Sequence, residues 1–217
     1  MINKKLLFSA ILILFVVLID QILKIWIKTT MTLGDEIVIF EWFKLHFVEN
    51  EGMAFSMKLG GQYGKLALTL FRIVAVGFLS YWLYTLSQQA KIGKNVLVSL
   101  SLITAGALGN IIDCVFYGVL FSESNAHAIA TFMPPEGGYA PLLHGKVVDM
   151  FLFPLYEGFL PQWLPLIGGN YFSFFNAIFN IADAAITVGV VLILIFQRSL
   201  FQTEEEQANP QPNTTDT

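Results

Sequence analysis

Charged residues are scarce in this sequence. They make up 13% of the 217 residues, whereas a soluble domain carries about 25%. Hydrophobic residues account for 55%, and the mean hydropathy is +0.65. This balance excludes an ordinary soluble protein and predicts an integral membrane protein. The length suits one compact bundle rather than several domains.

Cysteine is almost absent as well, because Cys114 is the only one. An intramolecular disulfide and a cysteine-based zinc site are therefore excluded. The three histidines, His46, His127 and His144, lack the spacing of metal ligands, so we expect no metal. Lysine and arginine form no basic stripe, and the net charge is −4, which argues against a nucleic-acid partner.

Long apolar runs are what the sequence does contain, and about 20 apolar residues cross the hydrocarbon core of a bilayer. Four segments are long enough: 6–27, 66–86, 96–115 and 172–196. The first lacks a signal-peptide cleavage site, so we expect it to be retained as a helix. We predict a mainly α, polytopic membrane protein, a bundle of four transmembrane helices in one domain (1–200). A disordered cytoplasmic tail (201–217) would follow.

The positions of the lysines predict the orientation. Lys4 and Lys5 precede the first span, and Lys91 and Lys94 lie in the short connection between the second and third spans. Because positive residues collect on the cytoplasmic side, we expect both termini in the cytoplasm. The first and third connections would then be extracytoplasmic.

The first connection, residues 29–63, is rich in strand-forming residues. The stretches "EIVIFEWFKLHFV" and "AFSMKL" flank a glycine-bearing turn at 50–52, which predicts a small extracytoplasmic β-sheet. Trp42, Phe43 and Phe47 could anchor this sheet in the membrane interface or form its core, and the sequence leaves both open.

Three acids lie inside the predicted spans. Counted from the basic residue at the cytoplasmic end of each span, Asp20 and Asp183 are 15 residues deep and Asp113 is 19. At 1.5 Å per residue these depths are roughly 22 Å and 28 Å. The three acids therefore lie at similar depths, near the outer face of the bilayer. Since a charge in hydrocarbon is costly, this layer of acids predicts a polar site beneath the outer headgroups.

Some of these residues also have a purely structural interpretation. Asp20 and Lys24 are spaced i, i+4 and could simply pair on one helix face, or could support a site. Asn110 and Asp113 are one turn apart in a segment whose glycines permit close helix contact, which favours structural support of a neighbouring helix or loop. Arg72 could be a counter-ion or could reach toward the interface.

Asp183 has no such partner nearby. It follows Asn180 by three residues in "FNIAD" and precedes an apolar run, so its partner must come from elsewhere in the chain. A lone buried carboxylate would simply take up a proton. Asp149, in the predicted short strand "HGKVVDMFLF", can supply a second acid or be an ordinary loop carboxylate.

Together these segments resemble the motifs of the lipoprotein signal peptidases, the type II signal peptidases of bacteria. The motif segments are "DQILK", "ENEGMAFS", "GALGNIID", "KVVDM" and "FNIAD", in the order of the family. The resemblance implies an aspartyl endopeptidase of the bacterial inner membrane, with its active site near the outer face. Its substrate would be a diacylglyceryl-modified prolipoprotein, cut just before the lipidated cysteine. Globomycin-type cyclic peptides would inhibit it.

Carried over by motif, the resemblance implies that Asp149 and Asp183 form the catalytic pair. The implied substrate-binding or supporting residues are Asp20, Lys24, Asn50, Gly52, Asn110, Asp113 and Asn180. Two neighbouring carboxylates share a proton, so one can activate water while the other polarises the scissile carbonyl. Such chemistry needs no metal or cofactor. The expected partners are the substrate and membrane lipid, and we expect a monomer.

Two features depart from the family pattern. Cys114 stands where the family usually has arginine, so either another cation, Lys146 or Arg72, takes its part or the support around Asp113 is rearranged. Residues 119–145 form an extracytoplasmic insertion where the family commonly has a short turn, and we interpret it as a lid.

Two other functions remain open from the residues alone. A proton-coupled transporter would use the acids as a relay, although they gather near one face and the chain has no evident internal repeat. An assembly or chaperone-like membrane protein would use them only structurally. Replacing Asp149 and Asp183 by asparagine distinguishes the three functions. The replacements would abolish proteolysis by a peptidase, alter the proton flux of a transporter, and have only modest effects on an assembly protein.

Overall fold

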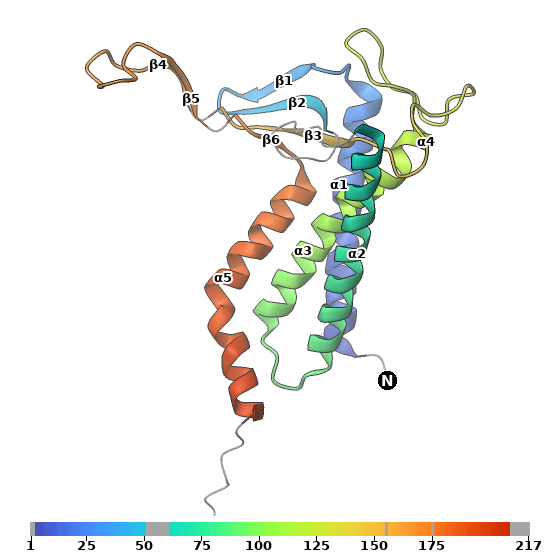
Figure 1. Ribbon diagram of the computed structural model, residues 1–217, viewed down its shortest axis with the longest axis vertical. Coiled ribbons are helices and arrows are strands. Elements are labelled where there is room, and N and C mark those ends of the chain that lie inside the picture. Colours follow the sequence, from blue (N-terminus) through green and yellow to red (C-terminus); the bar gives the residue numbers. More distant parts are fainter. Residues whose placement is uncertain (1–2, 51–60, 155, 175, 209–217) are drawn as a thin grey trace, which may run out of the picture. The chain divides into compact units, whose positions relative to one another are not determined.

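The structure is a computed structural model that describes residues 3–50, 61–154, 156–174 and 176–208 (Figure 1). The helices are α1 (Lys4–Thr30), α2 (Gly61–Gln88), α3 (Lys94–Ile112), the π-helix η2 (Asp113–Tyr117), α4 (Gly118–Leu120) and α5 (Ile181–Ala208). The strands are β1 (Glu36–Phe40), β2 (Phe43–Asn50), β3 (Val147–Leu152), β4 (Tyr156–Phe159), β5 (Tyr171–Phe174) and β6 (Ile178–Phe179). The chain divides into two compact units, one helical and one containing the sheet.

Three helices are long and apolar enough to cross a membrane: Lys4–Thr30, Tyr63–Gln88 and Lys94–Leu120. They correspond to the first three predicted spans. The fourth predicted span, 172–196, is wrong in its first part, because β5 and β6 occupy residues there and α5 begins only at Ile181. Aromatic and β-branched residues favour strands when a partner strand is available. At its other end α5 continues to Ala208, into the segment expected to be disordered.

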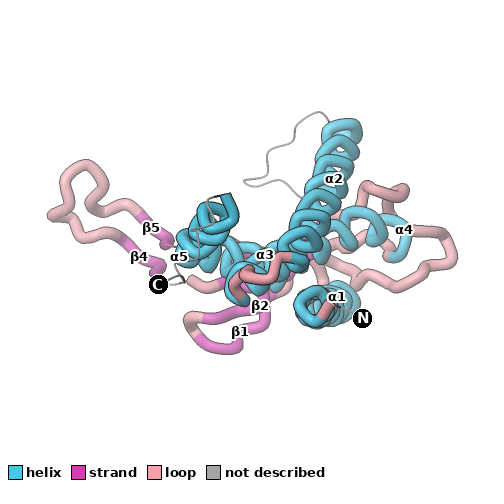
Figure 2. The backbone as a smooth tube through the Cα atoms, turned by 90° about the horizontal axis from the view of Figure 1, so that it is seen from below, coloured by secondary structure: helices cyan, strands magenta, loops and turns pink. Residues whose placement is uncertain are grey.

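The helical unit comprises residues 1–19, 70–109 and 181–217, and within it α3 lies between α2 and α5 (Figures 1 and 2). Its buried core joins α2 to the start of α3: Leu83, Leu86, Ile92, Val96, Leu97 and Leu100, with Ile13 and Ile193 packed against them. Many apolar side chains on α1, α2 and α5, such as Leu14, Phe78 and Leu194, remain exposed. A helix with apolar residues on both its buried and its exposed faces is typical of a buried or membrane helix.

Lys5 lies at one end of this unit. The Nζ of Lys5 donates to the carbonyls of Gln89 at 2.7 Å and Ala90 at 2.9 Å, and Asn3 Nδ2 donates to the carbonyl of Ser87 at 2.9 Å. These groups satisfy carbonyls at the C-terminal end of α2, where positive charge is favoured. The start of α1 and the α2–α3 connection therefore lie together.

Glycines allow α3 and α5 to approach closely. A Cβ atom on Gly106 would collide with the carbonyl of Ala182, and one on Gly189 would lie 2.7 Å from the Ser99 carbonyl oxygen. Helices in lipid associate largely through such close van der Waals packing. The predicted role of the glycines around residue 106 in helix contact is confirmed for Gly106.

We expect Gly106→Ala to lower the free energy of unfolding by about 1–3 kcal/mol, the usual cost of overpacking. Gly77→Ala on α2 is the matched control, because its Cβ would meet nothing within 4 Å, and we expect it to be neutral or slightly stabilising. Denaturation in mixed micelles of increasing SDS content measures both. Equal effects of the two variants would contradict the close α3–α5 contact.

The other unit, residues 20–69 and 110–180, contains an antiparallel sheet of strand order β1-β2-β3-β6 and a separate hairpin, β4–β5. The register of β2 and β3 pairs Val48 with Asp149 and Asn50 with Val147. The prediction of a small sheet is confirmed, although β3 and β6 join it from distant parts of the sequence. The stretch "AFSMKL" and Gly52 lie outside the described residues.

The core of this unit lies between the sheet and the end of α1. Its buried members are Ile27, Met31, Leu45, Phe47, Tyr117, Phe121, Val148 and Met150. Phe47 is therefore a core residue, whereas Trp42 is 55% exposed and fits the interfacial alternative. Phe121 and Ala130 are also buried, so the insertion at 119–145 packs partly into this unit rather than lying wholly on its surface.

Candidate active site

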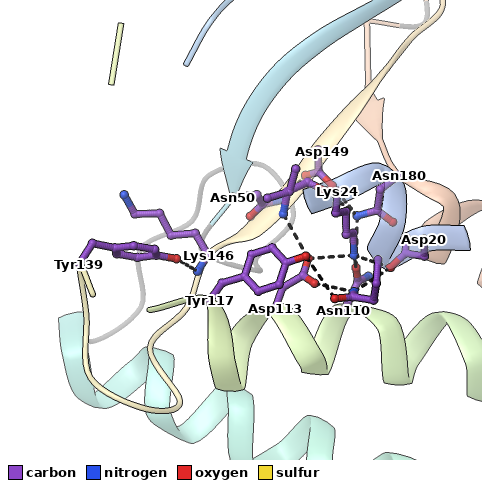
Figure 3. Close-up of polar contacts among 12 residues, drawn as sticks. Asp20, Lys24, Asn50, Asn110, Asp113, Tyr117, Tyr139, Lys146, Asp149 and Asn180 are labelled. Carbon is purple, nitrogen blue, oxygen red and sulfur yellow. Dashed lines mark hydrogen bonds and ion pairs between the residues drawn. The ribbon is translucent and has the colours of Figure 1, made fainter. Parts of the chain in front are cut away.

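Lys24 is fully buried and lies between two carboxylates (Figure 3). Its Nζ is 2.9 Å from Asp20 Oδ2 and 2.8 Å from Asp113 Oδ2, and it donates to Asn110 Oδ1 at 2.9 Å. These three acceptors match the three N–H groups of an ammonium. The pair that the i, i+4 spacing predicts on α1 is present, and Lys24 also ties α1 to α3 and η2.

Gln21 makes a second connection between the same helices. Its Nε2 donates to Asp113 Oδ1 at 2.9 Å and to Asp20 Oδ2 at 3.1 Å, while Tyr117 Oη donates to its Oε1 at 3.1 Å. Asp113 and Tyr117 are the first and last residues of η2, and π-helical turns of this kind often occur at functional sites. Sequence reasoning missed Gln21 and Tyr117, although an amide beside Asp20 within an apolar span was an available signal.

Lys24 is a cation that contacts Asp113. The sequence alone left open whether Lys146 or Arg72 takes the part of the family arginine or the support around Asp113 is rearranged. Lys146 Nζ lies 3.5 Å from Glu49 and 3.7 Å from Glu123. Cys114 is buried and adds no positive charge, while Lys24 pairs with both Asp20 and Asp113. This pairing favours the rearranged support.

Asp113 also reaches the strand that carries Asp149. Its Oδ2 accepts a hydrogen bond from the backbone N–H of Val148 at 3.3 Å. A Cβ atom on Gly145 would collide with the Asp113 carbonyl, so the chain leading into β3 passes directly against η2. The predicted supporting role of Asp113 thus has a structural basis in how it holds β3.

Asp149 is 3% exposed and receives two neutral amide donors. Asn180 Nδ2 donates to Asp149 Oδ1 at 2.7 Å, and Asn50 Nδ2 donates to Oδ2 at 3.3 Å (Figure 3). Asn180 is fully buried and also contacts Asn110 Oδ1 and the carbonyl of Val148, each at 3.2 Å. The structure therefore brings together Asn50, Asn110, Asp149 and Asn180, all of them predicted site residues.

Lys24 sets the direction of these hydrogen bonds. An ammonium can only donate, so Asn110 presents its oxygen to Lys24. That oxygen also accepts from Asn180, which therefore directs its NH₂ group toward both Asn110 and Asp149. A positive charge one side chain away thus favours the orientation in which Asn180 turns its NH₂ group, rather than its oxygen, toward Asp149.

Asp183 is half-buried on the first turn of α5. The Thr187 hydroxyl donates to its backbone carbonyl at 2.8 Å. Asp183 belongs to the helical unit and Asp149 to the sheet unit, and the pairing of their carboxylates stays a prediction.

A second buried ionic cluster lies at the end of β2. Lys28 and Glu49 form an ion pair, and Lys28 Nζ donates to Ser124 Oγ at 2.7 Å. Ser124 Oγ in turn donates to Glu49 Oε1 at 2.8 Å. Glu49 directly precedes Asn50, so this cluster fixes the strand end from which Asn50 reaches Asp149. It also attaches the insertion at 119–145 to α1.

Aromatic rings complete the second cluster. Lys28 Nζ lies 5.4 Å from the ring centroid of Phe121 and 5.1 Å from that of Tyr139, within cation–π range. The backbone N–H of Lys146 donates to Tyr139 Oη at 2.7 Å. Burial raises the pKa of Tyr139, so its hydroxyl stays neutral at physiological pH.

No group of three or more His, Cys, Asp and Glu side chains that could hold a metal ion occurs in the part of the chain that the structure describes.

We expect Lys24→Met to lower the free energy of unfolding by about 3–5 kcal/mol, because it leaves buried carboxylates without their cation. Adding Asp113→Asn to Lys24→Met should recover part of the loss. Denaturation in mixed SDS micelles gives both values. A single variant as stable as the natural chain would show that the pairing of Lys24 is energetically unimportant.

Lys28→Met should likewise destabilise the protein by about 3–5 kcal/mol. Lys44→Met is the matched control, since Lys44 pairs with Glu36 at 2.9 Å but both side chains are partly exposed. Exposed pairs contribute only about 0–1 kcal/mol. Limited proteolysis should also cut the Lys28 variant faster within 119–145. Similar stability and proteolysis of the two variants would argue against an anchoring role for Lys28.

Comparison with known proteins gives consistent similarities. Residues 12–198 match the family model described as signal peptidase (SPase) II. A lipoprotein signal peptidase of Porphyromonas gingivalis is 52% identical over 186 residues, covering 86% of this chain and 80% of the relative. One of Amoebophilus asiaticus is 37% identical over 192 residues, covering 87% and 77%.

Two solved structures, each described as a bacterial membrane enzyme, share the fold. One has a TM-score of 0.54 at 24% identity and covers 96% of this chain and 94% of its own. The other has a TM-score of 0.52 at 26% identity and covers 86% and 90%. The similarity therefore extends over nearly the whole chain.

Proposed function

Because the chain belongs to the signal peptidase II family, we propose that it is a membrane aspartic endopeptidase that removes signal peptides from prolipoproteins. Its substrate is the diacylglyceryl-modified form, and cleavage falls just before the lipidated cysteine. Asp149 and Asp183 are the catalytic residues. The observation that carries this assignment is the environment of Asp149, a buried carboxylate that accepts hydrogen bonds from the amides of Asn180 and Asn50.

Chain connectivity supports the participation of Asp183. Asn180 donates to Asp149 at 2.7 Å, and Asp183 follows Asn180 by three residues. Three residues span at most about 10 Å even when extended, so Asp183 stays close to a group that touches Asp149. Residues spaced i, i+3 at a helix start share a face, which favours an approach of the two carboxylates.

The two carboxylates divide the chemistry between them. Two acids at one site share a proton, and hydrogen bonds from N–H donors favour the ionised form of a carboxylate. Asp149, with donors on both oxygens, is therefore the base that takes a proton from water. Asp183 holds the shared proton, polarises the scissile carbonyl and then protonates the leaving amine.

The amide donors of Asp149 suit this role, because amides orient a carboxylate without adding charge. Two buried cations lie in the same unit as Asp149. Lys24 contacts Asp20 and Asp113, and Lys28 contacts Glu49. Asp20, Lys24, Asn110 and Asp113 act as positioning residues, and Asn50, Gly52 and Asn180 bind or orient substrate groups and the catalytic acids.

The substrate enters from the membrane in this proposal, and α5 acts as the fourth span. Its apolar part, Ile181–Phe196, is roughly 24 Å long at 1.5 Å per residue, and the helix continues to Ala208. Lys5 and the α2–α3 connection lie at one end of the helical unit, which is the cytoplasmic end by the positive-inside rule. Both termini are then cytoplasmic, and the active site lies near the outer face, where globomycin-type peptides would compete with substrate.

We expect purified protein in detergent to cleave a diacylglyceryl-modified prolipoprotein but not its unlipidated form. Asp149→Asn and Asp183→Asn should each lower the rate at least about 1,000-fold while leaving the fold intact, because each removes one acid of a pair that acts as a unit. A gel-shift assay measures cleavage.

Asp35→Asn is the matched control, since Asp35 is an exposed loop carboxylate, and its rate should equal that of the natural chain. Retained activity in either catalytic variant would overturn the pairing of Asp149 with Asp183. A folded natural chain that cuts neither substrate but alters proton flux in liposomes would favour the transporter.

A further inference from the structure

The β4–β5 hairpin, residues 156–174, stands apart from the four-stranded sheet (Figure 1). Tyr156 pairs with Phe174 and Phe159 with Tyr171, and the loop between the strands runs from 160 to 170. Its sequence, "YEGFLPQWLPLIGGNYFSF", contains one acidic residue, Glu157, and no lysine or arginine. None of the proposed catalytic or supporting residues belongs to it.

Many apolar side chains of this hairpin are exposed. Trp163 is 78% exposed and Leu166 is fully exposed. Phe159, Ile167, Tyr171 and Phe172 are also exposed. An exposed apolar patch that is contiguous and large marks an interaction site, and the low charge of the hairpin points to an apolar environment.

The backbone of the tip satisfies much of its own hydrogen bonding. Five backbone hydrogen bonds, with N···O distances of 2.9–3.3 Å, hold the tip together. The N–H donors and carbonyl acceptors are Leu160 to Asn170, Gly169 to Leu160, Leu164 to Pro161, Gly168 to Leu164 and Asn170 to Ile167. Pro161 and Pro165 have no N–H group to satisfy. Unsatisfied backbone groups are costly where water is scarce. The internal hydrogen bonds of the tip reduce this cost when the tip moves from water into lipid.

Leu166 adds a conformational observation. Its φ is +70°, a left-handed conformation that is unfavourable for residues with a Cβ. The side chain gains no burial within the chain in return, because it is fully exposed. Strained residues are retained where function requires them, and here the strain directs a leucine outward at the tip.

We propose that the tip of the β4–β5 hairpin inserts into the lipid bilayer at the membrane face where α5 begins. Only residues 175–180 separate β5 from α5, a reach of at most about 25 Å, so the hairpin cannot move far from the end of that apolar helix. Tryptophan and tyrosine favour the headgroup region, while Leu166 and Ile167 reach the acyl chains. Since the hairpin lacks basic residues, insertion does not require anionic lipid.

The insertion rests on the chain being a membrane protein and is independent of the catalytic assignment. Reconstituted full-length protein tests it through tryptophan fluorescence. Trp26, Trp42 and Trp82 are replaced by phenylalanine, so that Trp163 is the only tryptophan left. Vesicles of neutral phosphatidylcholine carry bromine either near the headgroups or near the bilayer centre, and iodide in the buffer reports exposure to water.

We expect Trp163 emission to be blue-shifted relative to N-acetyl-tryptophanamide and to be quenched at least twofold by the shallow bromolipid, with little quenching by iodide. Leu166→Asp should at least halve the bromolipid quenching. Leu142→Asp, at another exposed leucine of the same unit, should leave it unchanged.

Emission like that of the free amide, with strong iodide quenching and none by bromolipid, would overturn the proposal. So would shielding of Trp163 that depends on protein density in the vesicles and not on brominated lipid, because a second copy of the chain would then cover the tip. The test does not measure cleavage. It therefore stays valid even if the proposed peptidase function is wrong.

Discussion

The candidate site depends on the contacts that the ammonium group of Lys24 makes. A cation buried in an apolar helix bundle must have all its donors satisfied, and Lys24 meets this requirement with Asp20, Asp113 and Asn110. These acceptors come from α1, α3 and η2, so satisfying one charge fixes three segments. The same contact orients Asn110 and, through it, the amide of Asn180.

The buried ion pairs and the amides that contact Asp149 have different roles at this site. The buried cations lie among Asp20, Glu49 and Asp113, where they position helices and strand ends. Asp149 accepts hydrogen bonds from the neutral amides of Asn50 and Asn180. Amide donors orient a reacting acid without adding charge. The buried ion pairs therefore hold the segments that carry Asp149 and these amides.

The two departures from the family pattern that the sequence predicted lie near this site. Cys114 is buried beside Asp113, and Lys24 pairs with both Asp20 and Asp113. The insertion at 119–145 is attached by Lys28, Glu49 and Ser124, groups that also fix the strand end beside Asn50. The expected lid is thus connected to the site through the end of β2. The β4–β5 hairpin adds an apolar surface close in sequence to α5.

The sequence by itself determined the features that follow from local patterns. Composition and run length predicted a membrane protein and its first three spans. Strand-forming residues beside turn signals predicted the small sheet, and motifs selected the residues around Asp149. Only the tertiary structure decided that residues before Ile181 form strands, because β6 depends on pairing with the distant β3. The same holds for Lys24, whose partners Asp113 and Asn110 lie far along the chain while spacing on α1 reveals only Asp20. Periodicity reports which face a residue shares with its neighbours in sequence, and side chains brought together by folding leave no such local signal.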